Sequence, residues 1–279
     1  MLQQQSMEIS IAIPMFILWI ALIAIAVIMI NKGKMRQKTA ILILIISIAI
    51  GGILLGGLPN SVMPIQQIFL TVGGHSLLML LVPMLIILGL LLLSTLVFGR
   101  MFCGYACPVG AIQELASKIN FKSNLKEQKK VKYAVQTNQK WANITRWIFF
   151  ALSGLITIVW SFAILQLVNP FIGFKFFTNP LAVVLLIPLI SLVAVIGVSI
   201  FVYRPWCRYL CPFGALASIT SRFSRNKYTR TEDCTECGLC EKICPTQEAF
   251  KDSSKGECYY CNRCVEICPQ NAIVFKKAK

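Results

Sequence analysis

Eight cysteines near the C-terminal end have a spacing typical of iron–sulfur proteins. They form two runs, residues 234–244 and 258–268, each reading C-x2-C-x2-C-x3-C followed by proline. Three thiolates two residues apart can hold three corners of one cubane cluster, while the fourth cysteine crosses to the other cluster. The predicted ligand sets for two 4Fe-4S clusters are therefore Cys234, Cys237, Cys240 and Cys268, and Cys258, Cys261, Cys264 and Cys244.

Zinc is the alternative metal for these runs. Zinc sites use four ligands, usually as two pairs separated by a dozen or more residues. Two complete four-cysteine runs, each ending in Cys-Pro, do not fit that pattern. We therefore expect a dicluster ferredoxin-like domain whose clusters relay single electrons and do no bond chemistry themselves.

The other four cysteines belong to an internal repeat. Residues 100–112 read RMFCGYACPVGAI and residues 204–216 read RPWCRYLCPFGAL, and the two align without a gap at an offset of 104. Arg, both Cys, Tyr, Pro, Gly and Ala coincide. Each copy follows an apolar run and precedes an amphipathic stretch, as expected for parallel repeats of a two-span hairpin.

Parallel repeats would place both cysteine pairs at the same depth, around a pseudo-two-fold axis. The four thiolates could then hold one further iron–sulfur cluster between the halves of the bundle. Two alternatives remain: each pair is a redox-active dithiol, or the cysteines are structural. The residues concerned are Cys103, Cys107, Cys207 and Cys211.

Five apolar runs are long enough to hold these motifs in a membrane, since about 20 apolar residues span a bilayer core. They cover roughly residues 9–30, 39–57, 77–98, 147–169 and 181–203. We expect an all-α membrane helical bundle with a C-terminal α+β ferredoxin-like domain. The predicted domains are an N-terminal anchor span and basic loop (1–38), the first two-span repeat with its linker (39–146), the second two-span repeat (147–230) and the dicluster domain (231–279).

The basic residues predict the orientation of these spans. The net charge is +16, and 26 of the 27 Lys and Arg lie in residues 31–38, 99–146 and 204–279, with only Lys175 elsewhere. By the positive-inside rule these segments are cytoplasmic, so the N-terminus faces out and the ferredoxin domain faces the cytoplasm. Thiols stay reduced there, which favours metal over disulfides. Because topology explains the charge, we expect no nucleic-acid partner.

The motifs FCGYACPVGA and WCRYLCPFGA, each after a span hairpin and followed by the two C-terminal runs, resemble the NapH type of membrane polyferredoxin over residues 40–279. Related modules occur in the NosR type. The resemblance implies a quinol dehydrogenase component of a larger complex, with a quinone and a redox partner protein such as a cytochrome or ferredoxin-type subunit. The additional N-terminal span departs from the four-span pattern. Alternative functions are an assembly or maturation factor for a metalloenzyme, and a membrane redox sensor.

A quinol needs an apolar slot and proton acceptors. The five apolar runs contain no Asp, Glu, Lys or Arg, which argues against a proton pump. Residues 58–76 are apolar but punctuated, as a re-entrant or interfacial half-helix would be. They hold the polar candidates Gln66, Gln67 and His75. Since about 30 Å of membrane would separate these from the cysteines, the sequence favours a slot on the inner side, beside Cys103 and Cys207.

Overall fold

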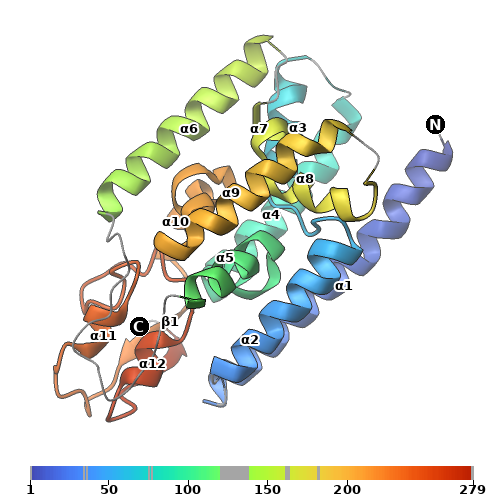
Figure 1. Cartoon of the computed structure of the whole chain (residues 1–279). Helices are drawn as coiled ribbons and strands as arrows, with labels where there is room; N and C mark the ends of the chain where they lie inside the picture. The colour runs from blue at the N-terminus through green and yellow to red at the C-terminus, as the bar shows by residue number, and fades with distance from the viewer. Residues whose placement is uncertain are drawn as a thin grey trace.

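A helical bundle carries a small cysteine-rich unit at one end (Figure 1). The computed structural model describes residues 2–33, 35, 37–74, 76, 78–119, 138–160, 164–180 and 183–277. His75 and most of the linker between the repeats lie outside the described residues. The predicted mostly helical bundle with a C-terminal ferredoxin-like region is confirmed.

Four helices in the described part of the chain are long and apolar enough to cross a membrane. They are Gln37–Leu54, formed by α2 (Gln37–Ile46) and the π-helix η1 (Ser47–Leu54); α4 (Leu81–Phe98); α6 (Gln139–Trp160); and Val183–Phe201, formed by η5 (Val183–Leu185) and α9 (Leu186–Phe201). The first apolar run falls within α1 (Leu2–Asn31). Five spans and an N-out orientation stay predictions.

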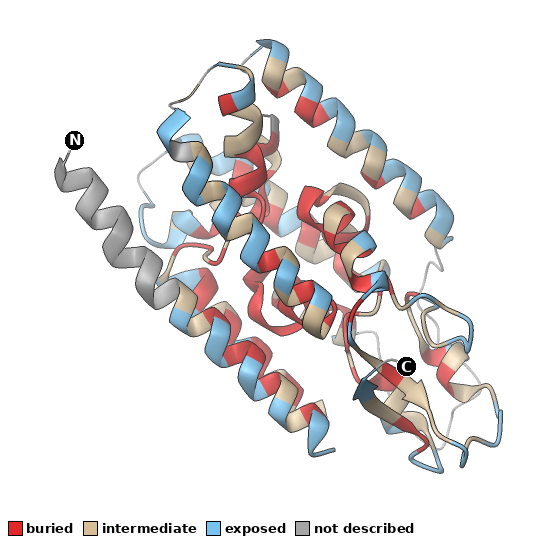
Figure 2. Ribbon diagram, turned by 180° about the vertical axis from the view of Figure 1, so that it is seen from behind, coloured by how far each residue is buried: buried red, intermediate tan, exposed pale blue. Residues whose placement is uncertain are grey.

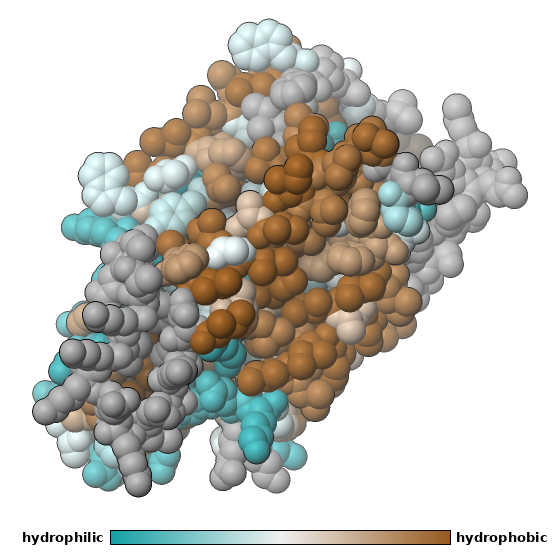
Figure 3. Space-filling model, in the orientation of Figure 1, coloured by the Kyte–Doolittle hydropathy of each residue, from teal (hydrophilic) through white to brown (hydrophobic). Residues whose placement is uncertain are grey.

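The outer surface of the bundle is apolar, as lipid contact requires. Figure 3 shows apolar side chains over the visible face of the bundle, with hydrophilic ones gathered near the ferredoxin-like region. Figure 2 shows that buried residues concentrate inside, around the turns that carry the motifs. Large aliphatic side chains of α4 are exposed, among them Leu85, Ile86, Leu90 and Leu93. Such a surface is stable only when lipid covers it.

The third long helix differs from its prediction. We expected an uncharged span over residues 147–169, but α6 begins at Gln139 and ends at Trp160, and it therefore includes Arg146. Arg146 is fully buried and pairs with Glu257 of the C-terminal region at 2.7 Å. The helix therefore begins before the predicted span, and Arg146 can lie in the interior because it has a buried carboxylate partner. That the span itself carries no charge stays a prediction.

Short helices fill the end of the bundle that lies away from the ferredoxin-like region. They are α3 (Met63–Val72), η2 (Leu78–Leu80), α7 (Ile164–Val168), α8 (Pro170–Gly173) and η4 (Phe174–Phe177). The expected half-helix within residues 58–76 is α3. The segments pack closely: a Cβ atom on Gly57 (φ +88°) would lie 2.1 Å from the Phe171 carbonyl oxygen, and one on Gly52 would lie 2.7 Å from the Phe174 ring.

Both cysteine motifs fold in the same way. Each begins with a short π-helix, η3 (Phe102–Ala106) or η6 (Trp206–Leu210), and continues as a helix that starts at the motif proline, α5 (Pro108–Ile119) or α10 (Pro212–Arg222). Proline is favoured at this first helical position because its missing N–H would have no partner there. The helices are exchanged between the halves: α5 packs on α9, and α10 packs on α4.

The C-terminal region is a small α+β unit. Strands β1 (Asn226–Arg230) and β2 (Ile273–Lys277) pair antiparallel, with Tyr228 opposite Phe275. Helices α11 (Leu239–Ile243) and α12 (Arg263–Ile267) lie between them in the chain. Because β1 is part of this sheet, the unit includes residues that precede position 231.

The glycine contacts yield a stability prediction. Replacing Gly57 with alanine adds a Cβ at a left-handed position and against a backbone oxygen, so we expect the free energy of unfolding to fall by about 2 kcal/mol or more. The control is Gly89→Ala in α4, where nothing lies within 4 Å of the added Cβ. Thermal unfolding in detergent measures both variants. Equal midpoints for the two would contradict the close approach of the loops.

Candidate metal centres

The eight C-terminal cysteines line two cavities. One is lined by Cys234, Cys237, Cys240 and Cys268, and the other by Cys258, Cys261, Cys264 and Cys244. Each cavity therefore combines three cysteines of one run with the last cysteine of the other run. This is the crossed grouping expected for two clusters. The assignment of these thiols as ligands stays a prediction.

The backbone of each run is folded so that its N–H groups can face sulfur. Glu236 and Gly238 of the first run have positive φ angles of 52° and 72°, and Tyr260 and Asn262 of the second run have 55° and 68°. Successive residues of this kind turn N–H groups into a concave surface that favours anions. Such a surface fits the sulfur atoms of a negatively charged cluster.

The last cysteine of each run already accepts backbone hydrogen bonds. The Cys244 sulfur accepts from the N–H of Glu248, and the Cys268 sulfur from the N–H of Ala272, both at 3.3 Å. The described residues hold no group of three or more His, Cys, Asp or Glu side chains placed around a single metal ion. Instead, the thiols are spread around each cavity.

The geometry of the repeat explains why its motif contains glycine. The N–H of Gly110 donates to the Cys107 sulfur and that of Gly214 to the Cys211 sulfur, each at 3.4 Å. A Cβ on Gly110 would lie 2.2 Å from the carbonyl oxygen of Cys103, and one on Gly214 would clash in the same way with Cys207. Any other residue would push the helix away from the cysteine turn.

The four motif thiols are buried together. Cys103, Cys107, Cys207 and Cys211 are all 5% exposed or less. Burial raises the pKa of the Cys107 thiol well above its ordinary value, and proximity to the other three cysteines raises it further. Burial likewise raises the pKa of Cys103 to about 11, against the opposing effect of Arg100. The four thiols thus influence one another electrostatically, and their facing across a shared site stays a prediction.

Gln113 joins the two halves at this site. It lies on α5, six residues after Cys107, and its side-chain N–H group donates to the Cys207 sulfur at 3.4 Å. Its side-chain oxygen accepts from the N–H of Trp206 at 3.0 Å. The aligned residue in the second copy is Ala217, so only one of the two pairs receives this donor.

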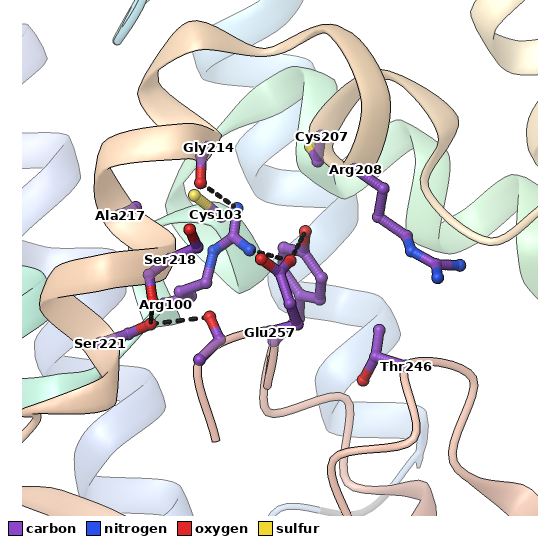
Figure 4. A network of polar contacts seen from close by, with 12 residues as sticks. Arg100, Cys103, Cys207, Arg208, Gly214, Ala217, Ser218, Ser221, Thr246 and Glu257 are labelled. Atoms are coloured by element: carbon purple, nitrogen blue, oxygen red, sulfur yellow. Dashed lines mark hydrogen bonds and ion pairs between the residues drawn. The ribbon is translucent and has the colours of Figure 1, made fainter. Parts of the chain in front are cut away.

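The arginines that precede the two motifs cross between the halves. Arg204 donates to the Cys103 carbonyl oxygen at 2.6 Å, and Arg100 donates to that of Gly214 at 3.4 Å. Arg100 also pairs with Glu257, and Figure 4 shows its guanidinium between Gly214 and Glu257, next to Cys103. Arg204 of the second repeat thus binds the cysteine turn of the first repeat. Arg100 of the first repeat binds the motif helix α10 of the second repeat.

Buried positive charge exceeds buried negative charge around the thiols. Among the described residues, five arginines and two glutamates are buried, a surplus of three positive charges. The glutamates are Glu114 and Glu257, and the arginines are Arg100, Arg146, Arg204, Arg208 and Arg263. Burial alone would raise the pKa of Glu114, but Arg263 and Arg204 hold it at about 2. A negatively charged group held by the four thiols would offset part of this positive charge.

Two buried hydrogen-bond donors in the motif residues lack a partner in the part of the chain that the structure describes. The indole N–H of Trp206 and the Nε of Arg100 have no acceptor among the described residues. Buried donors normally have partners. Anionic thiolates and the sulfides of an iron–sulfur cluster are acceptors, so these residues fit such a group.

Tyr259 connects the ferredoxin-like unit to the four-thiol site. Its ring lies between the guanidiniums of Arg100 and Arg204, at 4.4 and 4.5 Å from the ring centre. A Cβ on Gly104 would lie 2.5 Å from the Tyr259 carbonyl oxygen. Tyr259 directly follows Cys258, and Gly104 directly follows Cys103. The close contact between Tyr259 and Gly104 therefore joins the backbone next to the C-terminal cysteines to the backbone next to the motif cysteines.

The order of the three cysteine sites follows from their lining residues. The cavity with Cys258 also contacts Tyr203, which precedes the second motif, whereas the cavity with Cys234 is lined only by residues 230–273. We call these the proximal and the distal cavity. Cys237 in the distal cavity is the exposed cysteine of the set.

Sequence reasoning did not identify the residues that surround the thiols. The repeat alignment did contain a signal, since Arg100 and Arg204 occupy the same position in both copies. Glu114, Arg263 and Tyr259 carry no such signal because their roles depend on how the ferredoxin-like unit docks. Arg263 donates to Glu114 at 2.9 Å across this interface.

Comparison with known proteins supports these sites. A 4Fe-4S binding domain model matches residues 80–126 and again residues 184–231, so both cysteine motifs match one model. A second 4Fe-4S binding domain model matches residues 228–247 and 254–274. No solved structure is significantly similar to the chain.

Three relatives indicate the kind of protein. YccM of Escherichia coli, provisionally named an electron transport protein, is 30% identical over 62% of this chain and 47% of its own length. An uncharacterized protein of Methanocaldococcus jannaschii is 35% identical over 57% of this chain and 64% of its own length. The methylamine utilization ferredoxin-type protein MauN of Paracoccus denitrificans is 31% identical over 58% and 54%. The chain thus spans about half to two thirds of the length of these relatives.

The charge network around Glu114 yields a second prediction. Glu114→Gln leaves Arg204 and Arg263 without their carboxylate, so we expect a loss of about 3 kcal/mol of stability at neutral pH. Because the folded-state pKa is lowered to about 2, the wild-type advantage is present above pH 4.5 and disappears as the pH falls toward 2.

The matched control is Glu236→Gln, which removes an exposed pair with Lys251 and should leave stability unchanged. Unfolding of the purified protein, followed at pH 7 and pH 3, measures the difference. A Glu114→Gln variant as stable as wild type at pH 7 would contradict the buried network.

Proposed function

We propose that this chain, a membrane protein of the 4Fe-4S polyferredoxin type, carries electrons between the membrane quinone pool and a redox partner protein through three iron–sulfur centres. Iron–sulfur electron transfer follows from the domain matches and the ferredoxin-type relatives. The third centre, the quinone and the redox partner protein are proposals that go beyond these matches. In this proposal the chain is a quinol dehydrogenase component of a larger complex.

The buried charge surplus is the observation that carries the third centre. A four-thiolate iron–sulfur cluster is an anion, and the site between Cys103, Cys107, Cys207 and Cys211 is enclosed by arginines in excess over carboxylates. Thiolates around a cluster would offset part of this positive charge, whereas neutral thiols add no negative charge. The same holds for a redox dithiol or a structural role of these cysteines in the reduced state.

The order of the sites suits a relay. When bound, each cluster would accept and release one electron at a time. The chain places the four-thiol site inside the bundle, the proximal cavity beside it and the distal cavity at the surface of the unit. The side chains of Tyr259, Arg100 and Arg204, which pack on one another near the first two sites, are buried.

A redox partner protein would meet the chain at the distal cavity, because Cys237 is exposed there. Relatives named as ferredoxin-type and electron transport proteins support a partner of this class. In the predicted topology, the chain crosses the cell membrane several times, and this surface faces the cytoplasm.

Iron content tests the third centre. Anaerobically purified protein should contain about twelve irons and about twelve sulfides per chain, four for each 4Fe-4S cluster. The double variant Cys103→Ser, Cys207→Ser should contain about eight and keep the two ferredoxin-type EPR signals. A wild-type content of about eight irons would overturn the third centre.

Reduction of the clusters by quinol tests whether the chain exchanges electrons with a quinone, whichever way the electrons flow in the cell. In reconstituted wild type, a ubiquinol or menaquinol analogue should reduce the clusters seen by EPR. Cys268→Ser should abolish the distal cluster and slow electron delivery to a soluble acceptor, while proximal reduction persists. Ser254→Ala, an exposed change in the same unit, is the control. Failure of every quinol where dithionite succeeds would overturn the quinone terminus.

A further inference from the structure

A pocket lies at the end of the bundle opposite the ferredoxin-like unit. It is formed by the chain after η1 (residues 56–60), by α3 and by residues 166–175, which include α8. Two segments that are a hundred residues apart in sequence thus meet around it. None of the cysteine sites includes these residues.

Amide side chains line this pocket. They come from both segments: Asn60, Gln66 and Gln67 from the first, and Gln166 and Asn169 from the second. The apolar part of the wall includes Phe171, and the single amine is Lys175. Lys175 is also the one basic residue that the charge pattern of the sequence left outside the predicted cytoplasmic segments.

The two asparagines fix the pocket wall. The Asn60 side-chain oxygen accepts from the N–H of Val62 at 2.9 Å, and that of Asn169 accepts from the N–H of Phe171 at 3.1 Å. Each bond orients the start of a short helix, α3 or α8. An asparagine side chain that accepts a backbone hydrogen bond therefore positions each side of the pocket.

Gln66 is the informative residue. It is 4% exposed and lines the pocket, yet its amide makes no hydrogen bond to any other residue that the structure describes. The Gln66 amide is not among the fully enclosed unpartnered polar atoms of the described residues, so it reaches the space of the pocket, where a bound molecule can pair with it. Gln67 and Gln166 line the same space with amides that likewise lack side-chain partners among the described residues.

An amide suits a ligand that changes between quinone and quinol. Its N–H group donates to a carbonyl oxygen, and its carbonyl accepts from a hydroxyl group. The same side chain can therefore bind both forms without changing its own charge. We propose that this pocket binds the ring of a membrane quinone, with Gln66 as the buried contact and Lys175 at the mouth. The inference rests on the proposed quinone function.

Packed helices connect the pocket to the cysteine motifs. The sequence placed about 30 Å of membrane between residues 58–76 and the cysteines. In the structure, α8 contacts α5, the helix that begins directly after Cys107. On another path, Ser47 of η1 donates to the Ala106 carbonyl oxygen at 3.2 Å. The pocket floor and the four-thiol site are thus joined by direct packing within the bundle.

Oxidation of a bound quinol releases two electrons and two protons. Iron–sulfur centres held at the three cysteine sites would accept the electrons, with the redox partner protein as final acceptor. The protons leave through the mouth of the pocket, away from the ferredoxin-like unit. No acidic residue lines the pocket among the described residues, so water at the mouth would carry these protons.

Photolabelling tests where the ring binds. The full chain with its clusters, in phospholipid nanodiscs, is labelled with an azido-quinone and digested. We expect label on peptides covering residues 56–67 or 166–175, and competition by the unlabelled quinone. Label confined to residues 101–119 and 203–222 would overturn the pocket in favour of the inner slot. Label displaced by phospholipid but not by quinone would overturn quinone as the ligand.

Electron transfer supplies the second readout. Gln66→Leu should slow cluster reduction by quinol about tenfold or more, with unchanged cluster spectra and unchanged reduction by dithionite. Thr71→Val on the same helix, outside the pocket lining, is the control. If wild type is reduced by quinol and Gln66→Leu is equally fast, the pocket is wrong but the proposed function stands. If quinol fails with wild type, the proposed quinone function itself fails.

Discussion

The arrangement of the whole molecule depends on guanidinium groups buried between the two halves of the bundle. Arg100 and Arg204 each cross from one half to the other, and both also stack on Tyr259 of the C-terminal unit. Among the described residues, five arginines and two glutamates are buried, and their ion pairs run between the bundle and the docked unit. The bundle and the docked unit therefore stabilise one another.

The C-terminal unit therefore has a structural role in addition to its proposed role in electron transfer. In sequence it is a ferredoxin-like tail after a membrane domain. In the structure it supplies Glu257 to Arg100 and Arg146, and Arg263 to Glu114, so it provides ion-pair partners for buried charges of the helical part. Close packing of Gly104 against Tyr259 fixes the spacing between the sites. Electron relay requires such fixed spacing, which a flexible tail could not provide.

The sequence predicted what local spacing determines. Cysteine runs defined the crossed groupings, repeat alignment defined the paired motifs, and apolar runs defined four of the candidate spans. It could not predict that α6 would extend to include Arg146, because a buried carboxylate partner 111 residues away makes this possible. Nor could it place residues 166–175 against residues 56–67, since close glycine contacts and asparagine caps act only after the halves have packed.

An iron anomalous map of anaerobically grown crystals of the full chain tests the central claim most directly. The account predicts three separate iron peaks: one in the distal cavity, one in the proximal cavity, and one enclosed by Cys103, Cys107, Cys207 and Cys211. Two peaks, with the four motif cysteines as free thiols or disulfides beside the unchanged arginines, would contradict it.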